Sequence, residues 1–215
     1  MITLSETALY LIVVGAAFWL ALLWLRSGLG RKRQLGALDK TMAGLLALLL
    51  LMIPFGEIPL WKRLRWLLPN PSLPLVGMTC AALVARLFGA AFFKRGDWTA
   101  IWIFGAVVGS ALYLHQLVAG VTDLYYWGWE REIAAWVLGV LAVAFLVRGN
   151  RLGALLLAAL VAYGLSVFDS RNCWDYVMDP CFWITSVVAL LGRLWSLRGR
   201  SSDDVPVRVR IRDRG

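Results

Sequence analysis

The stretch IAAWVLGVLAVAFLVRGNRLGALLLAALVAYGLSVF, residues 133–168, decides the fold class. It contains two apolar runs, 133–147 and 152–168, separated by the basic turn RGNR at 148–151. Neither run carries a charge, and neither alternates apolar and polar positions as a half-buried strand does. Both runs approach the length of about 20 residues that a helix needs to cross the ~30 Å hydrocarbon core of a bilayer. We therefore expect two transmembrane helices joined by a short turn.

The composition of the whole chain is also that of a membrane protein. Its 215 residues are 60% hydrophobic and only 16% charged, and the mean hydropathy is +0.72. Soluble domains average about 45–50% apolar and roughly 25% charged residues. Because backbone groups in lipid must be paired within their own segment, we expect the apolar runs to be helices. Further runs lie at about 6–25, 41–55, 74–93, 99–121 and 180–197. The sequence thus predicts an all-α fold, a polytopic transmembrane helix bundle of about seven spans.

The segment LWKRLRWLL, residues 60–68, differs from these runs because it is rich in basic residues. At helical spacing Trp61 and the leucines fall on one face, whereas the basic residues fall largely on the other. A helix of this kind lies in the headgroup plane of a membrane. We expect one short interfacial amphipathic helix that rests on lipid headgroups or contacts an anionic polymer. Its interfacial contacts are predicted to be Lys62, Arg63 and Arg65.

The basic residues are distributed unevenly between the two sides that alternating spans define. Sixteen fall on one side and five on the other, and Arg86 is counted on neither. Lys and Arg collect in cytoplasmic loops, so this bias predicts a multi-pass protein of the cell inner membrane. Its amino terminus is expected outside and its carboxyl terminus in the cytoplasm. The five residues of the outer side are Lys62, Arg63, Arg65, Arg131 and Arg171.

The same bias explains the net charge of +9, so we expect no nucleic-acid partner. The predicted organisation is an integral membrane domain, 1–198, followed by a basic cytoplasmic tail, 199–215. Within the tail, VPVRVRIR at 205–212 alternates apolar and basic residues. This pattern fits a strand that adds to a partner's sheet, a basic tail on anionic lipid, or a solvated tail.

The loop DSRNCWDYVMDPCFW, residues 169–183, interrupts the apolar pattern with acids and two cysteines. The orientation places it outside the cytoplasm, where disulfides persist, so we expect a Cys173–Cys181 bridge. Two free thiols are the alternative, because spacing alone does not fix the distance between their Cα atoms. A metal site is not expected, since no histidine is near. Asp179 and Pro180 form a helix-start signal for the last span.

Three polar residues inside the spans are candidates for a function, because ionisable groups in lipid are costly and mark functional sites. Arg86 either snorkels to the headgroups or has a buried partner. His115 is either a neutral packing residue or a functional one. Cys80 matches His115 in depth and could form a nucleophile pair with it, although a buried cysteine is usually a small apolar residue.

Small residues in the spans predict close approach between helices. These glycines are Gly105, Gly109, Gly139, Gly153 and Gly164.

The chain contains no phosphate-binding loop, no metal-ligand ladder and no catalytic set with a recognisable spacing. We therefore expect no catalytic residues, no metal and no cofactor. Whether the protein is an enzyme stays open, with the balance against it. The predicted function is a non-enzymatic component of a membrane assembly, bound by membrane lipids and by protein partners. The alternatives are a small transporter or lipid-handling protein and an intramembrane cysteine enzyme.

Overall fold

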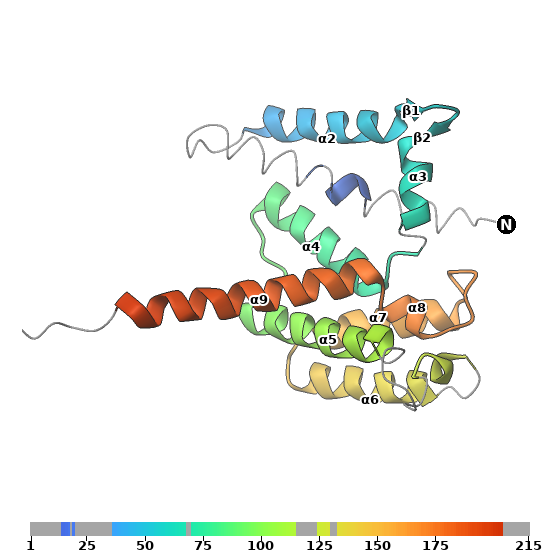
Figure 1. Cartoon of the computed structure of the whole chain (residues 1–215), viewed down its shortest axis with the longest axis vertical. Helices are drawn as coiled ribbons and strands as arrows, with labels where there is room; N and C mark the ends of the chain where they lie inside the picture. The colour runs from blue at the N-terminus through green and yellow to red at the C-terminus, as the bar shows by residue number, and fades with distance from the viewer. Residues whose placement is uncertain are drawn as a thin grey trace, which may run out of the picture.

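The computed structural model describes residues 14–17, 19, 36–67, 70–114, 124–129 and 133–203, which are mostly helical (Figure 1). The elements are α2 (Ala37–Met52), β1 (Pro54–Phe55), β2 (Ile58–Pro59), α3 (Leu60–Leu67), α4 (Leu73–Phe88), α5 (Arg95–Leu114), η2 (Tyr126–Gly128), α6 (Ile133–Val147), α7 (Leu152–Gly164), α8 (Trp174–Val177) and α9 (Pro180–Asp203). The two strands form a short antiparallel hairpin between α2 and α3. The expectation of a predominantly helical fold is confirmed at this level.

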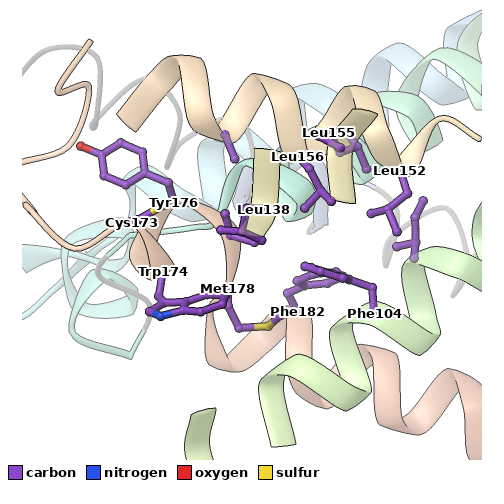
Figure 2. Packing of buried hydrophobic residues seen from close by; sticks show 14 of the residues in the cluster. Phe104, Leu138, Leu152, Leu155, Leu156, Cys173, Trp174, Tyr176, Met178 and Phe182 are labelled. Atoms are coloured by element: carbon purple, nitrogen blue, oxygen red, sulfur yellow. The ribbon is translucent and has the colours of Figure 1, made fainter. Parts of the chain in front are cut away.

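Helix α7 lies at the centre of the bundle and contacts α4, α5, α6 and the short helix α8. Leu152, Leu156 and Ala159 on α7 are completely buried. Figure 2 shows Leu152, Leu155 and Leu156 pointing into the same apolar core as Leu138 and Phe104. The core continues to α8 and the start of α9, where Figure 2 places Trp174, Met178 and Phe182 together.

Helices α5 and α9 pack closely along their length because α5 presents two glycines to α9. A Cβ on Gly105 would come within 2.9 Å of Phe182 Cζ, and one on Gly109 within 2.8 Å of Trp183 Cβ. Both distances are shorter than real Cβ contacts, so only glycine allows this approach. The prediction of close packing at this glycine pair is confirmed.

The α6–α7 hairpin depends on Gly153 in the same way. A Cβ at this position would lie 2.7 Å from the backbone nitrogen of Leu146, which cannot move without displacing α6. The other two predicted glycines do not share this role. Gly139 has a leucine side-chain atom no nearer than 3.9 Å, and nothing approaches Gly164 within 4 Å.

Two polar contacts give the relative direction of α5 and α9. Thr99 near the start of α5 accepts a hydrogen bond of 2.6 Å from Arg193 in the second half of α9. At the opposite end, Trp183 Nε1 of α9 donates to Ser110 Oγ of α5 over 3.1 Å. The two helices are therefore antiparallel. Figure 1 shows α5 and α9 running side by side, α4 oblique to them, and α2 lying apart from them.

The helix boundaries agree with the sequence to different degrees. Helix α6 begins and ends where the run 133–147 predicted, and α3 covers the described part of the predicted 60–68 segment. The run 74–93 was too long, because α4 ends at Phe88 and Gly89 adopts the left-handed conformation that terminates it. Of the first predicted span, 6–25, only residues 14–17 and 19 are described, and they are helical.

Among the described helices, α5 alone, with 20 residues, is long and apolar enough by itself to cross a membrane. The other apolar helical segments are shorter: Leu73–Phe88, Ile133–Val147, Leu152–Gly164 and Pro180–Ser196. At ~1.5 Å per residue, the 15 residues of α6 and the 13 of α7 extend about 22 Å and about 20 Å. The predicted number of seven spans is therefore not confirmed.

Candidate functional site

At the carboxyl-terminal end of α5, two segments far apart in sequence, 124–129 and 168–179, interlock; we call them the cap. Trp174 Nε1 donates to the carbonyl of Leu124 over 2.9 Å. Asn172 Nδ2 donates to the carbonyl of Tyr125 over 3.1 Å. The backbone N–H of Cys173 donates to the carbonyl of Gly128 over 3.2 Å. The loop that the sequence singled out is thus an ordered structural unit.

Asn172 is the centre of the cap and is completely buried. Besides its bond to Tyr125, its Oδ1 accepts the backbone N–H of Trp174 over 2.9 Å. Gly128 makes room for this amide, since a Cβ there would lie 2.8 Å from Asn172 Cγ and 2.6 Å from Trp174 Cδ1. The buried position of the Asn172 amide therefore requires glycine at position 128.

Asp175 joins the two segments of the cap through its side chain. Its Oδ1 accepts the Tyr125 hydroxyl over 2.7 Å, and its Oδ2 accepts the Ser170 hydroxyl. Burial raises the pKa of the Tyr125 hydroxyl, and the bond to Asp175 raises it further. Tyr125 therefore stays protonated and acts as a permanent donor to the carboxylate.

Tyr176 anchors the cap to the end of α7, and its side chain is completely buried. Its hydroxyl donates to the carbonyl of Phe168 over 2.9 Å and accepts the N–H of the same residue over 3.1 Å. Its ring stacks on Phe168 with centroids 4.7 Å apart and meets Tyr163 edge-on at 5.4 Å. These contacts fix the turn between α7 and α8.

Asp179 connects the cap to the start of two helices. Its Oδ1 accepts the backbone N–H of Phe182 over 2.9 Å, which confirms the predicted helix-start signal at α9. Its Oδ2 accepts the backbone N–H of Ser72 over 2.9 Å, and Ser72 is itself the N-cap of α4. Burial raises the pKa of the Asp179 carboxyl, although the hydrogen bonds from Ser72, Phe182 and Cys181 oppose this shift.

The opposite end of the bundle is organised by another buried acid, Asp97, which is 3% exposed. Its Oδ2 accepts the N–H of Lys94 over 2.8 Å at the start of α5. Its Oδ1 accepts the N–H of Arg151 over 3.1 Å at the start of α7. The guanidinium of Arg151 lies 4.8 Å from the ring centroid of Phe92.

The predicted Cys173–Cys181 disulfide is absent, because both residues are free thiols in the structure. Cys173 is buried in the core beside Tyr176 (Figure 2), whereas Cys181 is exposed in the first turn of α9. Burial raises the pKa of the Cys173 thiol to about 12, so it behaves as a small apolar residue. Helix α9 starts at Pro180, so Cys181 lies on the exposed side of a helix whereas Cys173 lies in the core. The spacing of eight residues in the sequence could not show this difference in burial.

The intramembrane candidates are not brought together as a group in the described structure. Arg86 lies in the last turn of α4 and is exposed, two residues before the helix ends. Cys80 lies in the middle of α4 and is a free, half-buried thiol. His115 lies outside the described residues, so its predicted pairing with Cys80 stays a prediction.

The predicted interfacial contacts lie on α3 as expected for an amphipathic helix. Trp61 and Leu64 pack against Leu51 of α2, whereas Lys62 and Arg63 are exposed. Arg65 lies on the same helix, but its side chain is outside the described part. Contact with lipid stays a prediction.

Within the described ranges, no group of three or more His, Cys, Asp and Glu side chains could hold a metal ion. The arrangement at both ends of the bundle instead pairs buried acids with backbone N–H groups. Asn172, Ser72 and Asp97 were not predicted to have a role. Ser72, followed by Leu73 and Pro74, carried a recognisable helix-start signal, whereas the partners of Asn172 and Asp97 lie far away in sequence.

Comparisons of the chain with protein-family models, curated proteins and solved structures found no match.

Proposed function

We propose that the chain is a multi-pass integral membrane protein that serves as a non-enzymatic component of a membrane assembly. The proposal keeps about seven spans, with the carboxyl terminus in the cytoplasm of a cell with an inner membrane. It is supported by the exposed apolar faces of the helices and by the hydrogen bonds that the buried polar side chains make to backbone groups.

The observation that carries the proposal is the exposed face of α6. This helix consists entirely of apolar residues, and such a helix is normally buried on all sides. Here Trp136, Val140 and Val147 are 72%, 68% and 82% exposed. An unbroken apolar helix face of this kind is stable where hydrocarbon, and not water, surrounds it.

The other helices of the bundle repeat this pattern. Their outward faces are apolar, whereas the polar and charged contacts lie at the helix ends, in the cap and around Asp97. Exposed apolar residues of these helices include Ile103 and Val107 of α5, Leu157 and Val161 of α7, and Ile184, Val188 and Leu191 of α9. Together with α6 they form an apolar belt between two polar ends.

The buried polar residues favour a structural role. Ser72, Asn172 and Asp179 hold the cap and the starts of α4 and α9, as described above. Asp97 joins the starts of α5 and α7, and Ser186 Oγ donates to the carbonyl of Phe182 within α9. Each of these side chains bonds to backbone groups, so each has a sufficient role in the scaffold.

A charge placed on the exposed face of α6 tests the membrane location. In lipid, Val140→Asp should prevent stable insertion, because an acid at the centre of a span costs about 2.5–3.5 kcal/mol. On a water-exposed surface the same change would alter stability by no more than about 0.5 kcal/mol. Ala91→Asp, an exposed position in the link between α4 and α5, is the control. The measurement is the resistance of each variant to carbonate extraction from membranes. Release of the wild-type protein by carbonate would reject the membrane location.

Cysteine accessibility tests the orientation. In a background without native cysteines, Arg148→Cys and Arg171→Cys place single thiols at the two ends of the bundle. In intact cells, a membrane-impermeant maleimide should label the second thiol and leave the first unlabelled. Labelling of both, or only of the first, would contradict the proposed orientation.

Co-purification tests the assembly role. The full chain, solubilised in mild detergent, should retain protein partners, and loss of residues 199–215 should remove those that bind on the cytoplasmic side. If Arg86→Ala or His115→Ala abolishes the cellular activity while insertion and partner binding stay normal, a transport or catalytic role replaces the proposed one.

A further inference from the structure

We propose that the end of the bundle organised by Asp97 contains a binding site for the phosphate of an anionic phospholipid. The site is formed by four cations, two at the start of α5 and two in the turn between α6 and α7: Lys94, Arg95, Arg148 and Arg151. We call them the basic rim. The inference rests on the proposed membrane location and adds a ligand class to it.

The geometry of the basic rim follows from the bonds of Asp97. Its two carboxylate oxygens hold the backbone nitrogens of Lys94 and Arg151, so the start of α5 and the α6–α7 turn lie against each other. The side chains of Lys94, Arg95 and Arg148 are exposed, and that of Arg151 is half-buried. Four cations from segments over 50 residues apart in sequence are thereby held at one end of the bundle.

The acid at the centre does not cover this positive surface. Asp97 is almost completely buried, and each of its oxygens is bonded to a backbone N–H rather than to a cationic side chain. The starts of two helices, α5 and α7, also lie here, and helix starts carry a partial positive charge. A phosphate at the rim would therefore meet cationic side chains, whereas Asp97 itself caps the backbone N–H groups beneath them.

Directly beside the cations lies an exposed apolar surface. The Arg151 guanidinium covers one face of Phe92, which is half exposed, and Val147 precedes Arg148 with most of its side chain exposed. Phe92 meets Phe93 edge-on at 4.9 Å, Phe93 meets Trp98 at 5.0 Å, and Trp98 stacks on Trp102 at 5.1 Å. Of these residues, Trp98 and Trp102 are of the type that is enriched at the headgroup level of a membrane.

The border between cations and apolar surface decides between ligands. An anionic phospholipid carries a phosphate joined to acyl chains, so one molecule satisfies the basic rim and the surface of Phe92 and Val147 together. A free phosphate would use only the cations, and an acidic protein segment would leave the apolar surface uncovered. Basic clusters beside transmembrane helices bind anionic headgroups in this way.

The experiment uses the full chain in mild detergent, titrated with phosphatidylglycerol or with zwitterionic phosphatidylcholine of the same acyl chains. Bound lipid is counted by native mass spectrometry. Phosphatidylglycerol should bind more tightly, and Arg148→Gln or Lys94→Gln should each weaken it roughly fivefold, the effect of one cation near an anionic surface. Binding of phosphatidylcholine should not change.

Arg171→Gln is the matched control, because it removes one exposed cation at the opposite end of the bundle. Equal binding of the two lipids, or an equal loss in Arg171→Gln and Arg148→Gln, would overturn the site. Full competition by inorganic phosphate at the concentration of the lipid would show that the acyl chains contribute nothing. Displacement of the lipid by a polyglutamate peptide would assign the basic rim to an acidic protein instead.

Failure of this inference is distinguishable from failure of the proposed function. The same variants are tested for carbonate extraction and thermal unfolding, which exposed substitutions at the rim should leave unchanged. Normal insertion without lipid selectivity rejects the basic rim alone, whereas extraction of the wild-type protein rejects the membrane location on which it rests.

Discussion

Replacement of Asn172 by alanine tests whether a single buried amide holds the cap together. In the wild-type protein this side chain bonds to the carbonyl of Tyr125 at 3.1 Å and to the N–H of Trp174 at 2.9 Å. Alanine would leave both backbone groups without these partners. A buried polar group that loses its partner costs about 1–3 kcal/mol, so the free energy of unfolding should fall by about 2–6 kcal/mol.

Thermal unfolding in mild detergent, followed by tryptophan fluorescence and circular dichroism, measures this loss. For a chain of this size each kcal/mol shifts the Tm by roughly 2–4 °C, so Asn172→Ala should melt roughly 4–24 °C below wild type. Asn172→Asp places a second acceptor oxygen against the Tyr125 carbonyl in a completely buried site, so its Tm should fall at least as far as that of Asn172→Ala. Arg171→Ala, at the exposed neighbouring position, should stay within about 2 °C.

A Tm of Asn172→Ala equal to that of the control would refute the reasoning, because the cap would then be held by other contacts. Limited proteolysis gives a second readout. The 168–179 segment should become sensitive to cleavage in Asn172→Ala and stay resistant in Arg171→Ala.

Three other measurements check separate parts of the structure. Gly153→Ala should lower the free energy of unfolding by about 1–3 kcal/mol, because its Cβ would meet the backbone of α6; Gly164→Ala, with open space around it, should not, and equal melting would argue against the α6–α7 packing. Burial raises the pKa of Asp179 above its ordinary value of 3.8. The stability that this carboxyl contributes in its protonated form is therefore lost as the pH rises from its ordinary pKa through its raised pKa. The Tm difference between wild type and Asp179→Ser, which retains a capping oxygen, should therefore narrow as the pH rises above about 4, and a widening difference would contradict this sign. A maleimide should label Cys181 in the native protein, whereas Cys173 should react only after denaturation and without any reductant; a requirement for reductant would restore the disulfide.

The parts of the fold that could be predicted were those decided by local sequence. Helix α6 has the predicted bounds because a charged segment precedes it and the RGNR turn follows it. Asp179 and Pro180 marked the start of α9 correctly, because the cap residue and the first helical position are adjacent in sequence. The amphipathic face of α3 follows from helical periodicity alone.

The cap could not be predicted, because the bonds between its two segments join residues that are 45 to 50 positions apart. Nothing in the local pattern around Asn172 specifies Tyr125 as its partner. Asp97 has the same property, since Arg151 lies 54 positions away. The loop 169–183 was correctly singled out as unusual, but its cysteines suggested a covalent clamp where hydrogen bonds and aromatic packing fix the chain.

The position of Arg86 shows a different limit of the sequence. Apolar residues continue to Phe93, so the predicted span included five residues beyond the end of α4. The glycine at position 89 was a signal for termination, but hydrophobicity alone does not distinguish a helical residue from an apolar link. Arg86 consequently lies nearer to a helix end than the predicted span implied.

The short α6–α7 hairpin has a consequence for the surroundings of the protein. Its helices extend about 22 Å and about 20 Å, whereas the hydrocarbon layer of a bilayer is about 30 Å thick. An embedded hairpin would compress the adjacent lipid, at a fraction of a kcal/mol for each ångström of mismatch. A neighbouring protein with equally short helices would relieve that compression. Hydrophobic mismatch would thus bring partners to this face without any specific polar contact.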